Sequence, residues 1–425
     1  MNRLVLAGVM CGALMASPAM SQQQPPPYDE IRREISALSD RVQKLEAENV
    51  ALKERNDRLE RMLSTQAPPS VAVETIPPAA AEVKPPPAAA AEAKSPTEPS
   101  PAPSLAPWYE KLKLSGLVIG DAYAVFENHD PAAEDQTGFW IRRGYLTLDG
   151  TIADAWSTRL RFEFNSPGDF KTNSKLTPFV KDAYLAWKSG GKELYLGMSP
   201  SPTFDVIEKF WGYRALEKTP VDLYRIGSSR DFGISFKGRA LGDKAAYHAM
   251  FGNGAGDGAE TNEGKKAMLS LSLRPTEALV FEIYGDFEDR PDSTDRTTYQ
   301  AFAGWKGARS RYGLQYAWQD RDATTGPGES VSVASLFGIW DVFGQSSLIA
   351  RYDRSFEGYP DADKIPYLPI ANGTKFDLAI LGWDYRLGRQ ISLMPNLEYV
   401  LYRDTHGVPA PDDDLYGKLT LYYQF

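Results

Sequence analysis

The chain has 425 residues, with 47 Lys and Arg against 56 Asp and Glu, a formal net charge of −9 and a mean hydropathy of −0.39. Its one cysteine, Cys11, lies in an N-terminal apolar run, which excludes disulfides and Cys-based metal sites from the rest of the chain. Beyond that run no stretch of 18 apolar residues occurs, which excludes an α-helical membrane span. Aromatic residues nevertheless make up 12%, as expected of a membrane barrel with aromatic girdles.

The first residues have the pattern of a secretory signal peptide. A short basic start at Arg3 precedes an apolar core over residues 4–15, and the small-x-small sequence Ala19-Met20-Ser21 precedes Gln22. The apolar core is too short to cross a bilayer. We therefore predict a signal peptide over residues 1–21.

Residues 28–65 have the apolar spacing of a coiled coil. Leu38, Leu45, Leu52 and Leu59 recur every seven residues, and oppositely charged pairs flank this seam. A single solvated helix is the alternative interpretation. Taken alone, the apolar pattern favours a two-stranded coiled coil over a three-stranded one. Residues 66–107 are rich in Pro and Ala, so they predict an extended spacer with a reach of roughly 120 Å.

Residues 108–425 carry short runs in which apolar and polar residues alternate, the period of a β-strand. Sixteen such runs occur, an even number, as in bacterial outer-membrane barrels. They are 113–126, 139–150, 156–165, 179–188, 193–198, 231–238, 244–251, 266–274, 279–287, 298–306, 311–320, 330–341, 347–354, 375–387, 390–402 and 414–425.

The connections between these runs are alternately short and long. An outer-membrane barrel has short periplasmic turns and long external loops, whereas a soluble β-sandwich has no reason to sort its connections. The fold class is therefore all-β, a 16-stranded antiparallel transmembrane barrel preceded by an α-helical coiled coil and a linker. The long connections are 127–138, 166–177, 199–230, 252–264, 288–297, 321–329, 355–374 and 403–413.

The alternation also predicts which side chains face lipid and which face the lumen. In the last strand Leu419 and Leu421 lie on one face and Lys418 on the other. Charges in mid-membrane cost a few kcal/mol each on the lipid side, so the charged face must line the lumen. Twelve basic residues are thereby predicted to point inward, with nine acidic ones: Arg143, Arg159, Arg161, Lys188, Lys237, Lys266, Arg274, Lys306, Arg311, Arg351, Arg386 and Lys418, then Asp149, Glu163, Asp182, Glu193, Glu282, Asp286, Asp353, Asp384 and Glu398.

The longest connection, 199–230, mixes aromatic residues such as Trp211 and Tyr224 with basic ones such as Arg225 and Arg230. A loop this apolar is predicted to fold into the barrel and narrow it. The alternative is an external loop that packs on a neighbouring subunit.

Several segments resemble the phosphate-selective porin O/P family of outer-membrane channels. They are the run from Phe139 through Arg142-Arg143 to Leu146, the run Lys181-Asp182-Ala183-Tyr184-Leu185, and Arg230-Asp231-Phe232-Gly233-Ile234. The resemblance covers most of residues 112–425 and implies a homotrimeric channel with inward-folded loops, whose arginines and lysines pass small anions, phosphate or polyphosphate. The residues predicted to line the pore and bind anions are Arg143, Arg159, Arg161, Lys188, Arg225, Arg230, Arg351, Arg386 and Lys418.

The sequence thus predicts a bacterial outer-membrane porin in contact with membrane lipid, with its coiled coil in the periplasm. Because the predicted lumen is only mildly basic, a non-selective porin remains an alternative, as does an envelope tether whose coiled coil contacts peptidoglycan. An enzyme is disfavoured, since His129, His248 and His406 form no recognisable constellation. We expect no catalytic residues, metal, cofactor or nucleic-acid partner.

Overall fold

The computed structural model describes Lys44 and residues 108–425, apart from residues 406 and 408. The predicted signal peptide (1–21), coiled coil (28–65) and linker (66–107) therefore lie, except for Lys44, outside the described residues. No helix among the residues described has the length and apolarity needed to cross a membrane.

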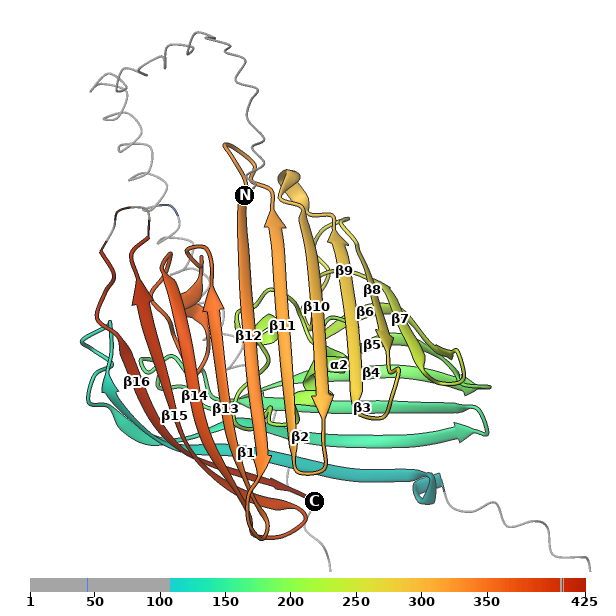
Figure 1. Ribbon diagram of the computed structural model, residues 1–425. Coiled ribbons are helices and arrows are strands. Elements are labelled where there is room, and N and C mark those ends of the chain that lie inside the picture. The colour runs from blue at the N-terminus through green and yellow to red at the C-terminus, as the bar shows by residue number, and fades with distance from the viewer. Residues whose placement is uncertain (1–43, 45–107, 406, 408) are drawn as a thin grey trace, which may run out of the picture. The chain divides into compact units, whose positions relative to one another are not determined.

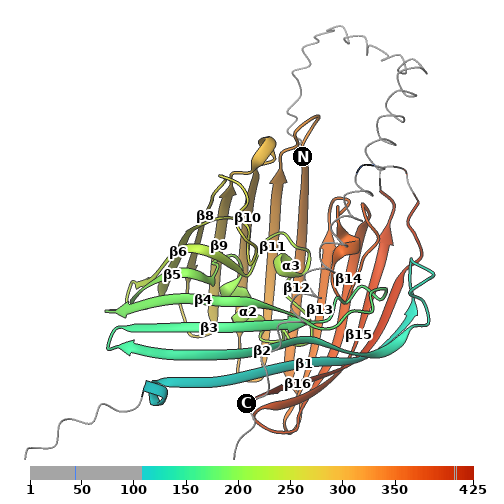
Figure 2. The ribbon, with the colours of Figure 1, turned by 180° about the vertical axis from the view of Figure 1, so that it is seen from behind.

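Sixteen antiparallel strands close into one barrel, in which each strand pairs with its sequence neighbours and β1 pairs with β16 (Figures 1 and 2). The predicted antiparallel barrel and its strand number are confirmed for this part of the chain. The elements are η1 (Trp108–Lys111), β1 (Leu112–Glu127), β2 (Thr137–Ala153), β3 (Trp156–Asn165), β4 (Thr177–Ser189), β5 (Lys192–Pro200), α2 (Asp205–Trp211), α3 (Pro220–Leu223), β6 (Arg230–Ala240), β7 (Ala245–Gly252), β8 (Lys266–Leu273), β9 (Leu279–Glu288), η2 (Pro291–Ser293), β10 (Arg296–Lys306), β11 (Ser310–Arg321), β12 (Glu329–Asp341), β13 (Ser346–Ser355), η3 (Ala362–Lys364), β14 (Lys375–Arg386), β15 (Ile391–Arg403) and β16 (Asp414–Gln424).

Connections at one end of the barrel are turns of at most five residues, and those at the other end are loops of seven to 29 residues. We call these the turn end and the loop end. Three loops matter below: loop 3 (residues 201–229), loop 4 (residues 253–265) and loop 7 (residues 356–374). The predicted sorting of short and long connections is confirmed.

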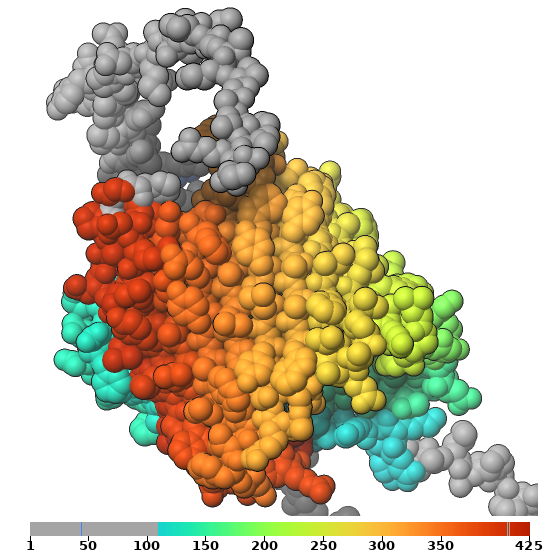
Figure 3. All heavy atoms as spheres, viewed as in Figure 1, coloured from blue at the N-terminus to red at the C-terminus, as the bar shows by residue number. Residues whose placement is uncertain are grey.

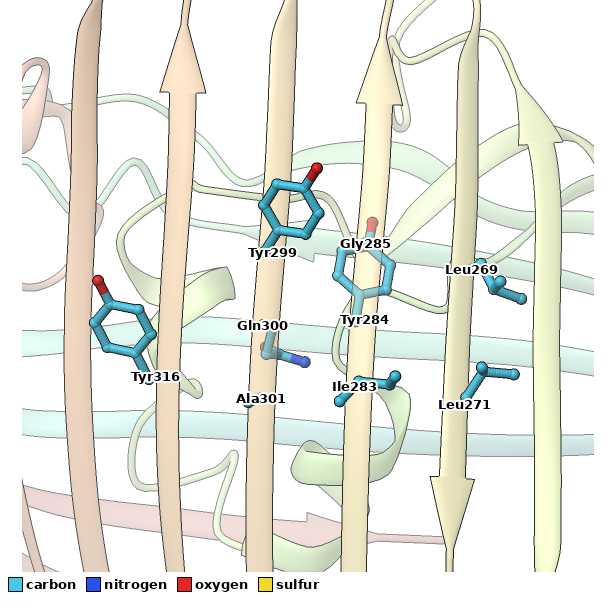
Figure 4. A pocket seen from close by; sticks show the side chains of 9 residues that line it. All are labelled: Leu269, Leu271, Ile283, Tyr284, Gly285, Tyr299, Gln300, Ala301 and Tyr316. Atoms are coloured by element: carbon cyan, nitrogen blue, oxygen red, sulfur yellow. The ribbon is translucent and has the colours of Figure 1, made fainter.

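The outer surface of the barrel carries the predicted apolar side chains. On β16, Leu419 and Leu421 are exposed while Lys418 and Thr420 are buried inside. Over β8–β11 the outer wall has an apolar groove of about 510 Å³, and Figure 4 shows its residues, with Tyr299 and Tyr316 on β10 and β11. Small residues at Gly285 and Ala301 leave this space between larger neighbours.

Two β-bulges shift the inner face of the barrel. In β2 the pairing with β1 skips Arg142, and in β4 the pairing with β3 skips Lys181. An extra residue in one strand interrupts the strict alternation of side chains. As a result Arg142 and Arg143 both point inward and are buried, and so do Lys181 and Asp182.

Candidate functional site

Loop 3 folds into the barrel, as its composition predicts. Seen from behind in Figure 2, its helices α2 and α3 lie within the ring of strands. Trp211 is fully buried, with its ring centre 4.9 Å from that of Phe337 on β12, and the rings of Phe210 and Phe302 lie 5.4 Å apart. Loop 3 therefore packs against the wall formed by β10–β12.

Hydrogen bonds from the wall satisfy the backbone carbonyls of this buried loop. Gln300 donates to the carbonyl of Thr203 at 3.1 Å, and Gln319 donates to that of Ile226 at 2.7 Å. The Tyr224 hydroxyl donates to Asp353 on β13 at 2.7 Å. Buried carbonyls need such partners, so these bonds fix where loop 3 lies.

Loop 7 also folds inward, although its own composition did not single it out in the sequence analysis. Leu368 and Ile370 are fully buried, and the Tyr367 hydroxyl donates to the carbonyl of Arg142 on β2 at 3.0 Å. Lys418 on β16 donates to the carbonyl of Tyr367 at 3.1 Å. Loops 3 and 7 together occupy the inside of β10–β16 and of the adjoining β1.

Two cavities lie along the opposite part of the inner wall. The loop-end cavity, of about 460 Å³, lies among loops 3 and 4 and the loop ends of β4, β6 and β8–β10. The turn-end cavity, of about 470 Å³, lies against β1–β4, where Arg159, Tyr184 and Lys188 line it. The two cavities thus lie at opposite ends of the barrel, and both are bordered by β4.

Seven basic and four acidic residues line the loop-end cavity. Its acids are all engaged: Asp222 with Arg214, Asp257 with Lys181 at 3.0 Å, Glu288 with Lys266 and Arg290, and Asp231 with two backbone amides. Three cations of this cavity form no salt bridge with an acid among the described residues. They are Lys218, Arg225 and Arg296.

Between the two cavities, cations on β2–β6 are paired with acids in a chain. Glu163 accepts from Arg143 at 3.0 Å and lies 3.2 Å from the Lys181 ammonium. Asp182 is shared by Arg230 and Arg161, the latter at 3.4 Å. These pairs hold the side chains of the inner wall in place.

Burial and neighbouring charges shift the pKa of three groups in loops 3 and 4. Burial lowers the pKa of the Lys218 amine, Asp222 partly counteracts this, and the positive charges of Arg143 and Arg214 act in the same direction as burial. Burial alone would raise the pKa of the Asp222 carboxyl, but Arg214 and Lys218 outweigh it and hold that pKa well below its usual range. Burial raises the pKa of Asp257 in loop 4 despite the nearby Lys181.

No protein-family model matches the sequence, and no curated protein matches it. Solved structures do match. The anion-selective porin from Comamonas acidovorans aligns with a TM-score of 0.54 and 15% identity over 74% of this chain and 99% of that one. OmpF of Salmonella typhi, in complex with daunomycin, aligns with a TM-score of 0.54 and 11% identity over 74% of this chain and 97% of that one. OmpT of Vibrio cholerae in its trimer form aligns with a TM-score of 0.52 and 14% identity over 74% of this chain and 99% of that one.

The barrel has the porin fold.

Within this porin fold, the predicted pore-lining residues have different environments. Arg159 and Arg161 are partly exposed on β3, Lys188 is 53% exposed at the turn-end cavity, and Arg386 is 42% exposed at the turn end of β14. Arg225 and Arg230 line the loop-end cavity, and Arg143 is buried next to Glu163.

Two of the predicted residues are closed off from the lumen. The Lys418 side chain is 0% exposed, paired with Glu398 at 2.5 Å beneath loop 7. The Arg351 side chain is 1% exposed, paired with Asp353 and stacked over Trp211 beneath loop 3. Both support the inward loops in this structure, and neither side chain is accessible from the lumen.

Sequence reasoning missed Arg142, Lys181, Lys218 and Arg296. The two bulges hide Arg142 and Lys181 from a strict alternation, although Arg142-Arg143 and Lys181-Asp182 are adjacent charged pairs in strand segments. Lys218 lies in a loop, where no alternation applies, and Arg296 lies just outside the predicted strand 298–306.

The two histidines described lie in separate places. His129 at the loop end of β1 contacts Asp414 at 3.0 Å and the Tyr402 hydroxyl at 3.1 Å, so it is not a freely solvated side chain. His248 is buried on the inner wall beside Ser235, at 2.7 Å. In the part of the chain that the structure describes, no group of three or more His, Cys, Asp or Glu side chains could hold a metal ion.

Proposed function

We propose that this protein is an outer-membrane porin, a water-filled channel through which small anions diffuse passively, phosphate and polyphosphate among the candidates. The observation that carries the anion preference is the charge at the loop-end cavity. Its four acids are all engaged by neighbouring groups, whereas Lys218, Arg225 and Arg296 form no salt bridge with an acid among the described residues. Uncompensated cations at a mouth raise the local concentration of anions.

The path of the solute is proposed to run from the loop-end cavity, past Arg161 and Arg159, to the turn-end cavity beside Lys188. The porin fold supports a location in the outer membrane, in contact with its lipid. The trimer form printed for the Vibrio cholerae structure supports a homotrimer. The anion-selective porin of Comamonas acidovorans shows that this fold can serve anions, and the family resemblance suggests phosphate as one of them.

The proposal is tested by the zero-current voltage of the full chain in planar bilayers across a potassium chloride gradient. We expect stepwise conductance and a voltage with the sign of chloride preference. A voltage near zero would favour the non-selective porin, and an absence of steps from folded protein would refute the channel. Adding phosphate to the same bilayers and recording the block of chloride current tests whether phosphate competes for the path.

The double variant R159Q/R161Q should move this voltage toward cations. Each guanidinium has an acidic neighbour, Asp149 or Asp182, that the substitution would leave uncompensated. At 4 Å one charge in water contributes about 1 kcal/mol, or about fivefold, so the loss of two charges should lower the anion-to-cation permeability ratio by at least about fivefold. Lys192→Gln is the matched control, because Lys192 is exposed on the outer wall at the turn end. An unchanged ratio in R159Q/R161Q would place the path elsewhere.

The anion preference should also fall as the pH is raised. A lysine is charged below its pKa, and the pKa of Lys218 is lowered, so its charge is lost at a lower pH than that of a free lysine. We expect the zero-current voltage to move toward cations at a lower pH than the one at which ordinary lysines lose their charge. Lys218→Arg should keep its charge and remove this part of the pH dependence. Identical pH profiles for the wild type and Lys218→Arg would contradict the role of Lys218.

A further inference from the structure

The outer wall carries a cluster of charges at the loop end of β13–β15. Arg354, Lys375, Asp377 and Arg403 make up this outer basic cluster, and the strand register pairs Arg354 with Asp377 and Lys375 with Arg403. On β14, Lys375 and Asp377 have the same parity as Trp383, which is exposed on the lipid side. The cluster therefore lies outside the lumen, where the membrane meets water.

The cluster holds one carboxylate for three cations, and this carboxylate contacts only two of them. Asp377 lies 3.7 Å from Arg354 and 3.4 Å from Arg403, and both distances exceed a good hydrogen bond. Arg354 is 45% exposed, and within the described residues the Lys375 ammonium has no partner. The cluster keeps an excess of two positive charges with donors free to bind.

The ion pair between Asp377 and Arg403 is loose. In the described structure, Asp377 Oδ1 and Arg403 Nε lie 3.4 Å apart and neither makes a hydrogen bond, although Arg403 donates through Nη2 to the carbonyls of Ser355 and Phe376. Asp413 accepts from Tyr399 and from the Tyr402 amide, and Glu357 accepts from Ser332. Among the described residues, neither acid forms a salt bridge with a cation of the cluster.

An apolar groove of about 640 Å³ lies on the same strands, nearer the turn end. Leu381 and Trp383 on β14, Leu397 on β15 and Leu419 on β16 line it. Leu381 follows Asp377 by four residues, which places the groove roughly 14 Å from the cluster along the strand. The outer wall of these strands, coloured orange to red, faces the viewer in Figure 3.

The groove over β8–β11 in Figure 4 provides an internal comparison. It is also apolar, at about 510 Å³, but the outward strand residues at its loop end are uncharged or acidic. They are Ala267, Phe287, Thr297 and Asp320. Of these two grooves, the one on β13–β16 combines an apolar surface with a basic cluster at its loop end, and the one on β8–β11 does not.

We propose that Arg354, Lys375 and Arg403 bind a phosphate of a lipid in the outer leaflet, and that an acyl chain of this lipid occupies the groove below. Cations at a membrane surface attract anionic headgroups by about 1 kcal/mol per residue, and near the interface they cost little on the lipid side. This inference rests on the membrane location in the proposed function, and it is independent of the solute that the channel passes.

The test is a titration of bisphosphorylated lipid A into the folded full chain in nonionic detergent, with bound lipid counted by native mass spectrometry. The double variant R354Q/K375M should bind at least about tenfold more weakly, because it removes two of three phosphate contacts. Lys192→Met is the matched control, an outward lysine at the turn end, and it should bind like the wild type. Equal affinity in R354Q/K375M and the wild type would overturn the proposal.

Further measurements separate the headgroup, the fold and a competing occupant. Dephosphorylated lipid A should bind the wild type as weakly as lipid A binds the double variant, and equal binding of both lipids to the wild type would overturn the proposal.

Heat-modifiable mobility on gels shows whether R354Q/K375M folds. If it does not fold, the single variant Lys375→Met decides, since the Lys375 ammonium makes no described contact. Should the variants change the oligomer mass with lipid affinity intact, the surface contacts a second copy and the proposal fails. Conductance measured in parallel tests the proposed channel, so the lipid site and the channel function can each be refuted independently of the other.

Discussion

Replacing Arg142 with methionine is expected to cost the barrel about 3–5 kcal/mol of its free energy of unfolding. The Arg142 side chain is only 3% exposed. It donates to both oxygens of Asp121 at 2.9 Å and to the carbonyl of Leu216 at 2.7 Å, and it lies 3.4 Å from Glu217. Its removal would leave two carboxylates buried without a cation, and it would also detach loop 3 from β2.

Equilibrium urea unfolding in detergent, followed by tryptophan fluorescence, measures this cost. Arg159→Met is the matched control, because Arg159 is 29% exposed and its partner Asp149 is also solvated, so its loss should cost about 1 kcal/mol or less. The double variant R142M/D121N should recover part of the loss, since the side-chain oxygen of Asn can still accept from Trp140 and its amide can donate to the Thr420 hydroxyl. Equal losses in Arg142→Met and Arg159→Met would show that burial of the pair is unimportant.

The barrel could be predicted from sequence because its constraints are periodic. Lipid on one side and water on the other force alternation along every strand, and the final strand shows it, with Leu419 and Leu421 outside and Lys418 inside. The sorting of turns and loops follows from the topology alone. The local sequence pattern is enough to predict the direction of a side chain wherever the surroundings alternate with the two-residue period of the strand.

The candidate site was less predictable, because it depends on departures from that period. Each of the bulges, at Arg142 and at Lys181, turns two consecutive charged side chains inward. A rule of strict alternation would assign one residue of each pair to the lipid side. Lys418 was placed correctly on the inner face, yet loop 7 covers it. Which loop covers which wall is decided by contacts between residues far apart in sequence, such as Tyr367 with Arg142.

Trp211→Ala is expected to release loop 3 while the barrel stays folded. The ring is fully buried against Phe337, its Nε1 donates to the carbonyl of Glu217 at 2.8 Å, and Arg351 lies 5.6 Å above it. Truncating a buried tryptophan to alanine costs about 3–5 kcal/mol, and here the loss falls on the docking of loop 3. The hydrogen bonds between strands are untouched. Single-channel conductance should therefore rise severalfold and become noisier, with a weaker anion preference.

Trp305→Ala is the matched control, because Trp305 is half-exposed on the outer wall of β10 and should leave conductance unchanged. Heat-modifiable mobility on gels establishes that both variants keep the barrel. If Trp211→Ala conducts like the wild type, loop 3 does not narrow the path, and the solute must be selected by the walls alone. If conductance rises while the anion preference stays, the preference comes from wall cations such as Arg159 and Arg161 rather than from Lys218 and Arg225, which loop 3 carries into the lumen.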